Sequence, residues 1–274
     1  MMRSKAALLC VVLLLAGFSA FARGEVEEAG VKRPVIKVAS NVQIPMRIYF
    51  EGEQIKGYEY EIYREALNRA GYDTYVVDVA FAGIFAGLQA EKWSIAASNI
   101  FITAARAQEM DYSDPYLESF DCIIIRKGDT AVKALADLRG KVVGTELGTT
   151  QAAYAAQLES RHGPFQIRGF EDLETQFLDL EAKRIDALTL GYPTAVSYIK
   201  ERQQYEILAT SEDNFMIGAF FRKGDPLRDK FNQALNAMKR DGTIERLYRE
   251  YFGQPVPPGS APTRIFTELY VPAK

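Results

Sequence analysis

One short stretch of the sequence combines hydroxyl, amide and guanidinium groups in an order that could bind an anion. The stretch Ser98 to Arg106 joins an apolar, strand-like segment to a helix-like one. Thr103 suits the N-cap position, which places Arg106 in the first helical turn. A cation there opposes the positive end of the helix dipole, and a bound anion would remove the conflict. The stretch therefore predicts an anion site; the alternative is a surface arginine paired with Asp111 or Asp114.

A second loop offers similar groups. The segment Gly148-Thr149-Thr150-Gln151 follows the strand-like residues 141–145 and opens a helix. Free backbone N–H groups at a helix start, with hydroxyls beside them, can also hold an anion. The alternative is an ordinary capped turn, since such caps are common.

The segments around these loops alternate between strands and helices. The first series contains strands at 35–39, 74–80 and 95–98, with helices at 58–70 and about 81–88 between them. The second series, after about Ser119, contains strands at 141–145, 165–168 and 185–190, again with helices between them. This order predicts an α/β fold in which mainly parallel sheets are covered by helices. Ligands bind at the carboxyl ends of such strands, so the two loops could grip an anion between two lobes.

The start of the chain has the pattern of a secretory signal peptide. Arg3 and Lys5 precede the almost wholly apolar residues 6–17, and Ala20-Phe21-Ala22 is a small-x-small cleavage site. We expect cleavage after Ala22 and a soluble, exported protein. The formal net charge of −3 becomes more negative when the two basic residues are removed, which argues against nucleic acid as a partner.

Few residues suggest redox, metal or nucleophilic chemistry. Cys122 lies in an apolar run that predicts a buried strand, where an inert thiol is expected. The sequence contains a single histidine, His162, and no His/Cys cluster, so we expect no metal site and no cofactor.

Several motifs together resemble those of the periplasmic amino-acid-binding proteins of ABC importers. This is family 3 of the bacterial extracellular solute-binding proteins, which includes lysine/arginine/ornithine-, histidine- and glutamine-binding proteins. The resemblance covers about residues 35–253 and lies in the order and spacing of short motifs. These are Gly57-Tyr58-Glu59-Tyr60-Glu61-Ile62, the segment 83–88, Ile102-Thr103-Ala104-Ala105-Arg106, Tyr112-Ser113-Asp114-Pro115-Tyr116, the segment 138–144, Asp241-Gly242-Thr243 and Tyr251-Phe252-Gly253.

The resemblance implies a two-lobed, type II periplasmic-binding-protein fold of the venus-flytrap kind. Lobe 1 would comprise residues 34–119 and 217–253, and lobe 2 residues 120–216. Two crossing strands would form the hinge, and residues 254–274 would form a C-terminal tail along the surface.

The resemblance also implies roles for individual residues. Arg106 matches the arginine that grips the α-carboxylate of the ligand, and Thr150, with Thr149 and Gln151, matches donors to the same carboxylate. The positions that match ligand-lining residues of the family are Ser98, Asn99 and Phe81. For Phe81 the alternative is a core residue, because it shares a helical stripe with other apolar side chains.

Three positions depart from the family pattern. The motif Arg184-Ile185-Asp186-Ala187 is usually followed, five residues after its Asp, by an Asp that binds the α-amino group; here that position is Gly191. The usual aromatic residue before the proline of the first loop is Gln43, and the usual Ser or Thr two residues after Asn99 is Phe101. A buried ammonium without a carboxylate is costly. We therefore expect either a ligand that lacks a free α-amine or a counter-charge from another acid such as Glu146.

These observations favour a binding protein over an enzyme. It would capture an amino acid or related small carboxylate between two lobes in the periplasm, act as a monomer, and deliver its ligand to an ABC permease in the inner membrane. One alternative is an exported enzyme of the same fold, similar to cyclohexadienyl dehydratases. The other is a ligand-sensing module that docks on a signalling partner.

Overall fold

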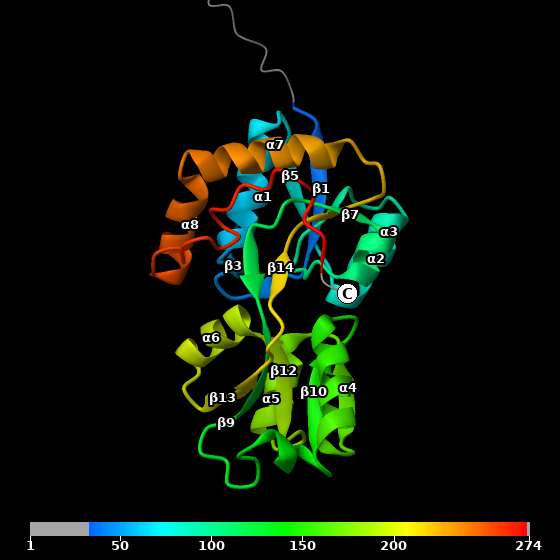
Figure 1. Ribbon diagram of the computed structural model, residues 1–274, viewed down its shortest axis with the longest axis vertical. Helices are drawn as coiled ribbons and strands as arrows, with labels where there is room; N and C mark the ends of the chain where they lie inside the picture. The colour runs from blue at the N-terminus through cyan, green and yellow to red at the C-terminus, as the bar shows by residue number, and fades with distance from the viewer. Residues whose placement is uncertain (1–32, 273–274) are drawn as a thin grey trace, which may run out of the picture. The chain divides into compact units, whose positions relative to one another are not determined.

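The computed structural model of the protein describes residues 33–272 and contains two five-stranded sheets, each with its own helices (Figure 1). The predicted signal peptide, residues 1–22, lies outside the described residues. The first sheet has the order β5-β1-β6-β15-β7, formed by β5 (Asp73–Asp78), β1 (Val35–Ser40), β6 (Ile95–Ala96), β15 (Phe220–Phe221) and β7 (Asp111–Tyr112). Strand β1 is parallel to β5 and β6, whereas β15 is antiparallel to both of its neighbours.

Five helices pack with the first sheet and complete lobe 1. They are α1 (Tyr58–Arg69), α2 (Phe81–Gln89), α3 (Ala104–Glu109), α7 (Leu227–Arg240) and α8 (Thr243–Phe252). A three-stranded sheet of β2 (Gln43–Ile44), β3 (Ile48–Glu51) and β4 (Gln54–Lys56) precedes α1. The buried face of α1 includes Ile62, Tyr63, Ala66 and Leu67, which recur at helical spacing.

The second sheet, with three further α-helices, forms lobe 2. Its order is β11-β10-β12-β9-β13, formed by β11 (Gln166–Phe170), β10 (Val142–Glu146), β12 (Ala187–Gly191), β9 (Asp121–Arg126) and β13 (Tyr205–Thr210). The helices are α4 (Thr150–His162), α5 (Leu173–Glu181) and α6 (Tyr192–Glu201), with a short 3₁₀ helix η1 (Leu135–Leu138). Cys122 is fully buried in β9, and burial raises the pKa of its thiol, as expected for an inert cysteine.

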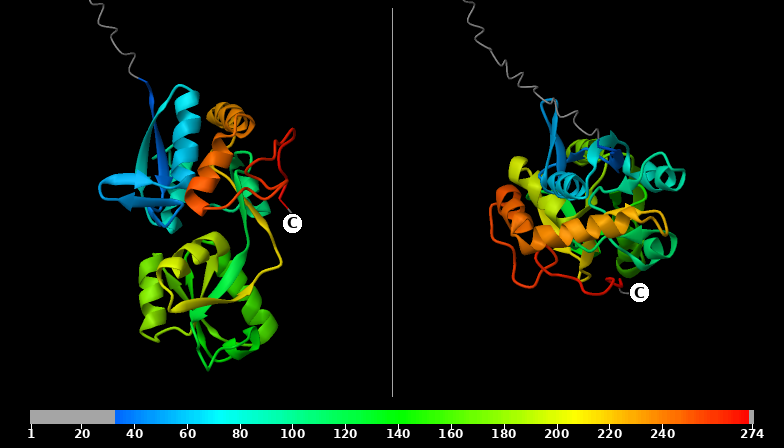
Figure 2. Two further views of the ribbon diagram at one scale, coloured as in Figure 1. Left: turned by 90° about the vertical axis from the view of Figure 1, so that its left-hand side faces the viewer. Right: turned by 90° about the horizontal axis from the view of Figure 1, so that it is seen from above.

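The chain passes between the two sheets twice (Figure 2). Strand β8 (Leu117–Ser119) leads from the first sheet to the second, and β14 (Phe215–Ile217) leads back. The two strands pair with each other in antiparallel fashion. They are the crossing strands that the resemblance implies, whereas the precise lobe boundaries stay a prediction.

The C-terminal segment is anchored to lobe 1. The Lys239 ammonium of α7 donates to the carbonyl of Pro115 at 2.6 Å and to that of Arg264 at 2.9 Å. The Tyr112 hydroxyl donates to the carbonyl of Tyr270 at 2.7 Å. Ala261 is fully buried, so part of this segment packs into the protein rather than only following its surface.

Candidate functional site

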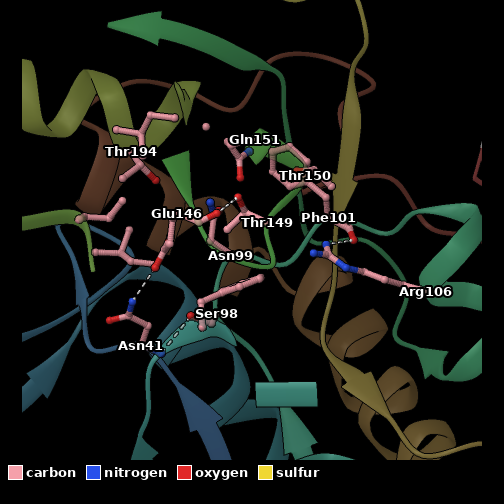
Figure 3. Close-up of a pocket in the computed structure, with 15 residues that line it drawn as sticks. Asn41, Ser98, Asn99, Phe101, Arg106, Glu146, Thr149, Thr150, Gln151 and Thr194 are labelled. Atoms are coloured by element: carbon pink, nitrogen blue, oxygen red, sulfur yellow. Dashed lines mark hydrogen bonds between the residues drawn. The ribbon is translucent and has the colours of Figure 1, made fainter. Parts of the chain in front are cut away.

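A pocket lies where the strand ends of the two lobes meet (Figure 3). It contains about 420 Å³ of space that no protein atom fills, part of it open to solvent. The lining residues are Asn41, Ile44, Phe81, Ser98, Asn99, Phe101 and Arg106 from lobe 1, and Glu146, Thr149, Thr150, Gln151, Leu173, Leu190, Gly191 and Thr194 from lobe 2. Most of them follow or end a strand, as expected for a ligand site in an α/β fold.

The pocket is formed by strand ends of both sheets. In lobe 1, Asn41 follows β1 and Ser98 closely follows β6. In lobe 2, Glu146 ends β10 and Gly191 ends β12. Strands β1 and β6 are parallel to each other, and so are β10 and β12, so the carboxyl ends of each pair meet at one edge of their sheet. The alternation of strands and helices in the sequence therefore predicted that these loops follow strand ends.

Arg106 is held over two aromatic rings at one side of the pocket. Its guanidinium carbon lies 5.7 Å from the ring centroid of Phe81 and 5.0 Å from that of Phe85. It donates to the carbonyl of Phe101 at 2.9 Å and to that of Gly148 in lobe 2 at 3.2 Å. Burial lowers the pKa of Arg106 to about 10. A poorly solvated cation of this kind is suited to a carboxylate, which could accept two parallel hydrogen bonds from it.

The N-cap predicted before Arg106 is present. The Thr103 hydroxyl accepts a hydrogen bond from the backbone N–H of Arg106 at 3.3 Å, and α3 begins at Ala104. In the described residues, neither Asp111 nor Asp114 forms an ion pair with Arg106. The arginine therefore points to the pocket rather than to the surface acids that the alternative required.

The loop of lobe 2 is shaped by its glycine and its cap. Gly148 has a φ of +78°, and a side chain there would place Cβ 3.5 Å from the Cα of Ala82 in α2. Thr149 is the N-cap of α4, and its hydroxyl accepts from the N–H of Ala152 at 3.3 Å. Thr150 is the first residue of the helix, so its own N–H is free of intrahelical bonding.

Asn99 has a backbone conformation that a buried carboxylate supports. Its φ is +54°, which asparagine tolerates better than most residues. Its backbone N–H donates to Oε2 of Glu59 at 2.6 Å, and the hydroxyl of Tyr116 donates to Oε1 of the same carboxylate. Glu59 is almost fully buried, and burial raises its pKa. This carboxylate thus joins the ligand loop to Tyr116, next to the crossing strand β8.

A second carboxylate, Glu146, lies on the opposite side of the pocket from Arg106 (Figure 3). The side-chain amide of Asn41 in lobe 1 donates to its Oε1 at 3.1 Å, and Glu146 is only 9% exposed. Burial raises the pKa of Glu146 to about 7, with a further contribution from Asp172. Glu146 is therefore an acid in the pocket itself, where the sequence suggested a counter-charge.

A third acid, Asp121, lies directly behind the lining residue Gln151. The side-chain amide of Gln151 donates to Oδ1 of Asp121, which is 2% exposed. Burial raises the pKa of Asp121 to about 7, although Gln151 and Arg106 both favour its ionised form. No local pattern in the sequence singles out Asp121.

The predicted lining residues lie together, with one exception. Ser98, Asn99, Phe81, Phe101, Arg106, Thr149, Thr150, Gln151 and Gly191 all line the pocket. Gln43 does not. In the short strand β2 alternate side chains face opposite ways, so Gln43 is exposed and its neighbour Ile44 lines the pocket instead.

Phe101 connects the pocket to the crossing strand β14. Its ring stacks on that of Phe215 in β14, with centroids 4.9 Å apart and an interplanar angle of 19°. It also forms an isolated backbone bridge with Ile217. The residue that replaces the usual Ser or Thr thus adds an apolar wall and touches a crossing strand.

Five lining residues were missed at the sequence level: Asn41, Ile44, Leu173, Leu190 and Thr194. Asn41 could have been found, because it follows β1 as Ser98 follows β6, and the same rule applies to both. The apolar residues carry no such signal, since an apolar wall and an ordinary core position look alike in a sequence.

The described residues limit other types of site. Within residues 33–272, no cluster of three or more potential metal ligands is present. In the same range, no helix combines the length and the apolar character that crossing a membrane requires.

The family model of the bacterial extracellular solute-binding proteins, family 3, matches residues 36–254. The chain belongs to this family. Its members share the type II periplasmic-binding-protein fold, so the two lobes and the crossing strands described above are the family architecture.

Relatives of this family 3 solute-binding protein are named for amino acids. The arginine-binding extracellular protein ArtP of Bacillus subtilis is 28% identical over 82% of this chain and 88% of its own length. An ancestral arginine-binding protein, solved bound to arginine, has a TM-score of 0.76 at 27% identity and covers 81% of this chain and 100% of its own. The ancestral amino acid-binding protein AncCDT-1, described as a precursor of cyclohexadienyl dehydratase, has a TM-score of 0.73 at 27% identity, covering 80% and 95% of the two chains.

Proposed function

We propose that the protein captures an amino acid or a closely related small carboxylate in the pocket between its lobes and delivers it to an ABC permease in the inner membrane. The observation that carries this proposal is Arg106, a partly buried guanidinium that forms no ion pair in residues 33–272 and lies at the edge of a two-lobed pocket. The names of the relatives, which are amino-acid-binding proteins, support it.

In the proposed complex, Arg106 binds the carboxylate together with the free N–H and the hydroxyl of Thr150. These groups come from different lobes, so the ligand stabilises the arrangement in which the lobes approach each other. Thr149 and Gln151 border the same place, and Ser98 and Asn99 line the side of lobe 1. Export to the periplasm with cleavage after Ala22, and action as a monomer, are parts of the same proposal.

A thermal-shift screen tests the proposal. The panel pairs each L-amino acid with its amide, which keeps the side chain and the amine but lacks the carboxylate. A ligand at about one hundred times its dissociation constant adds roughly 2.7 kcal/mol to the free energy of unfolding, which raises Tm by about 2–4 °C per kcal/mol. We expect at least one acid to raise Tm and its amide not to do so. If no compound with a free carboxylate raises Tm, the proposal is wrong.

The enzymatic alternative has one specific observation in its favour, the similarity to AncCDT-1. Glu146 and Asp121 have raised pKa values and could in principle transfer a proton. Incubation with prephenate or arogenate, followed by ultraviolet detection of an aromatic product, separates the two functions. We expect no turnover by the purified protein.

A further inference from the structure

The charged groups around the pocket do not balance one another. Arg106 is the only lysine or arginine among the lining residues, whereas two buried carboxylates, Glu146 and Asp121, lie in or directly behind the lining. None of the ion pairs in residues 33–272 includes any of these three side chains. A buried charge without a partner is unfavourable, so this arrangement calls for a ligand that supplies the missing charges.

Asp121 occupies the strand position directly opposite Gly191. Strands β9 and β12 are antiparallel, and their register pairs Gly191 with Asp121. Side chains of directly opposite residues point to the same face of a sheet with Cβ atoms about 5 Å apart. Asp121 therefore projects on the side where a residue at 191 would project, and its carboxylate accepts from Gln151 there.

A side chain at position 191 would point toward the same groups. A Cβ built on Gly191 would lie 3.6 Å from Nδ2 of Asn99, 3.6 Å from Cζ of Phe101 and 3.7 Å from Nε2 of Gln151. All three are ordinary van der Waals contacts, so a Cβ would fit at this position without displacing a neighbour. The resemblance implies a carboxylate at position 191. In this protein the carboxylate nearest in strand register is that of Asp121, on the neighbouring strand β9.

Glu146 faces the other side of the pocket. Figure 3 shows it with Asn41 on the side opposite Arg106, with Asn99 and Thr149 between them. The amide of Asn41 donates to its carboxylate, and the titratable groups that interact with its charge are Asp172 and Tyr198. None of these is a cation, so Glu146 has a hydrogen-bond donor but no counter-charge.

We infer that the ligand is a cationic amino acid, whose carboxylate binds Arg106, whose α-ammonium faces Asp121 across the space left by Gly191, and whose distal cation binds Glu146. This inference rests on the proposed function and narrows its ligand class to net charge +1. The carboxylate that faces the α-ammonium then lies on β9 instead of at position 191 of β12. The raised pKa values of the two acids agree with this assignment, since a bound cation would stabilise their ionised forms.

Four matched compounds test the inference by isothermal titration calorimetry. L-Lysine has both amines, 6-aminohexanoate lacks the α-amine, L-norleucine lacks the distal amine, and hexanoate lacks both. Each is titrated into the wild-type protein, Asp121→Asn and Glu146→Gln. Glu53→Gln is the matched control, because Glu53 is exposed and makes no ion pair.

We expect a crossed pattern of affinities. In the wild-type protein and in Glu53→Gln, loss of either amine weakens binding at least about 30-fold, as for removal of one partner of a buried charge pair. In Asp121→Asn, lysine and 6-aminohexanoate bind within about threefold of each other, while norleucine remains weaker than lysine. In Glu146→Gln, the two results exchange places.

Four outcomes overturn the inference, and the first three need no variant to fold. If 6-aminohexanoate or norleucine binds the wild-type protein as tightly as lysine, one of the two acids has no ligand role. If neutral L-amino acids bind more tightly than lysine and L-arginine, the proposed function stands and the inference is wrong. If no compound with a free carboxylate binds, both fail together. A loss of affinity in both variants that is the same for all four compounds would also overturn it, because a structural defect does not select among them.

Discussion

Replacing Asp121 with asparagine should stabilise the ligand-free protein. The side chain is 2% exposed, and burial raises its pKa from 3.8 to about 7. The folded protein therefore holds the proton more tightly than the unfolded chain does, and ionised Asp121 destabilises the fold. Asparagine has nearly the same shape and keeps an oxygen that can accept from Gln151, but it carries no charge.

The magnitude follows from the pKa difference. The interval from 3.8 to about 7 corresponds to about 4 kcal/mol at roughly 1.36 kcal/mol per pKa unit, which is an upper limit for pH values above 7. The new amide N–H groups need partners in a buried place, which offsets about 1–3 kcal/mol. We expect a net gain of about 2 kcal/mol, or a rise in Tm of about 4–8 °C.

The pH dependence gives the sign of the effect. Well below pH 3.8, the ordinary pKa of this carboxyl, Asp121 is protonated in both states, so the charge contributes nothing to the difference between the variant and the wild-type protein. As the pH rises from 4 to 7, the unfolded chain ionises first and the wild-type protein loses stability relative to the variant. Above pH 7 the difference stays constant.

Calorimetric unfolding from pH 4 to 8 without ligand measures this effect. Asp73→Asn is the matched control. Asp73 is exposed, so removing its charge relieves no cost of burial and should not produce this gain in stability. A gain that appears only above pH 4 and levels off near pH 7 supports the reasoning. A variant that is less stable at every pH, or a gain that does not change with pH, would refute it.

Three further changes have defined outcomes. Arg106→Lys keeps the charge but loses the planar fork, so the affinity for any carboxylate ligand should fall at least about 30-fold by calorimetry, and an unchanged affinity would exclude the carboxylate role. Glu59→Gln leaves one of two acceptors, so the loop at Asn99 should loosen and ligand affinity should fall several-fold; loss of Tm with unchanged affinity would mean that Glu59 serves stability alone. Lys239→Met removes two hydrogen bonds that hold the C-terminal segment, so residues 254–272 should be cleaved faster in limited proteolysis, with a loss of about 1–2 kcal/mol in unfolding free energy; an unchanged cleavage rate would contradict this.

The sequence predicted the parts of the site that obey local rules. Arg106 stood out because a cation in the first turn of a helix conflicts with the dipole, and Thr149 because its loop has capping chemistry. Both signals depend on residues within a few positions of each other. The same is true of the alternation of strands and helices, which placed the loops at strand ends.

The errors and omissions arise where the structure is not local. Gln43 was chosen in place of Ile44, because a strand of two residues is too short for the alternation of side chains to be visible in the sequence. Asp121 was missed for a stronger reason. It lies seventy residues before Gly191, and only the register of β9 and β12 makes them neighbours.

The pairing of Asp121 with Gly191 changes how the missing aspartate is interpreted. If function required a carboxylate at one sequence position, Gly191 would indicate a ligand without an α-amine, as the sequence suggested. The binding energy of a ligand, however, depends on where the carboxylate lies and not on which strand carries it. Directly opposite residues of an antiparallel pair share one face of the sheet. The side-chain amide of Gln151 donates to Asp121 and would lie 3.7 Å from a Cβ at position 191, so it is close to both positions.

Gly191→Asp should then place a second acid beside Asp121, and like charges at this distance raise each other's pKa. We therefore expect Gly191→Asp to weaken lysine binding or leave it unchanged in the wild-type background, and to restore it in Asp121→Asn. If Gly191→Asp does not restore lysine binding in Asp121→Asn, the two positions are not equivalent.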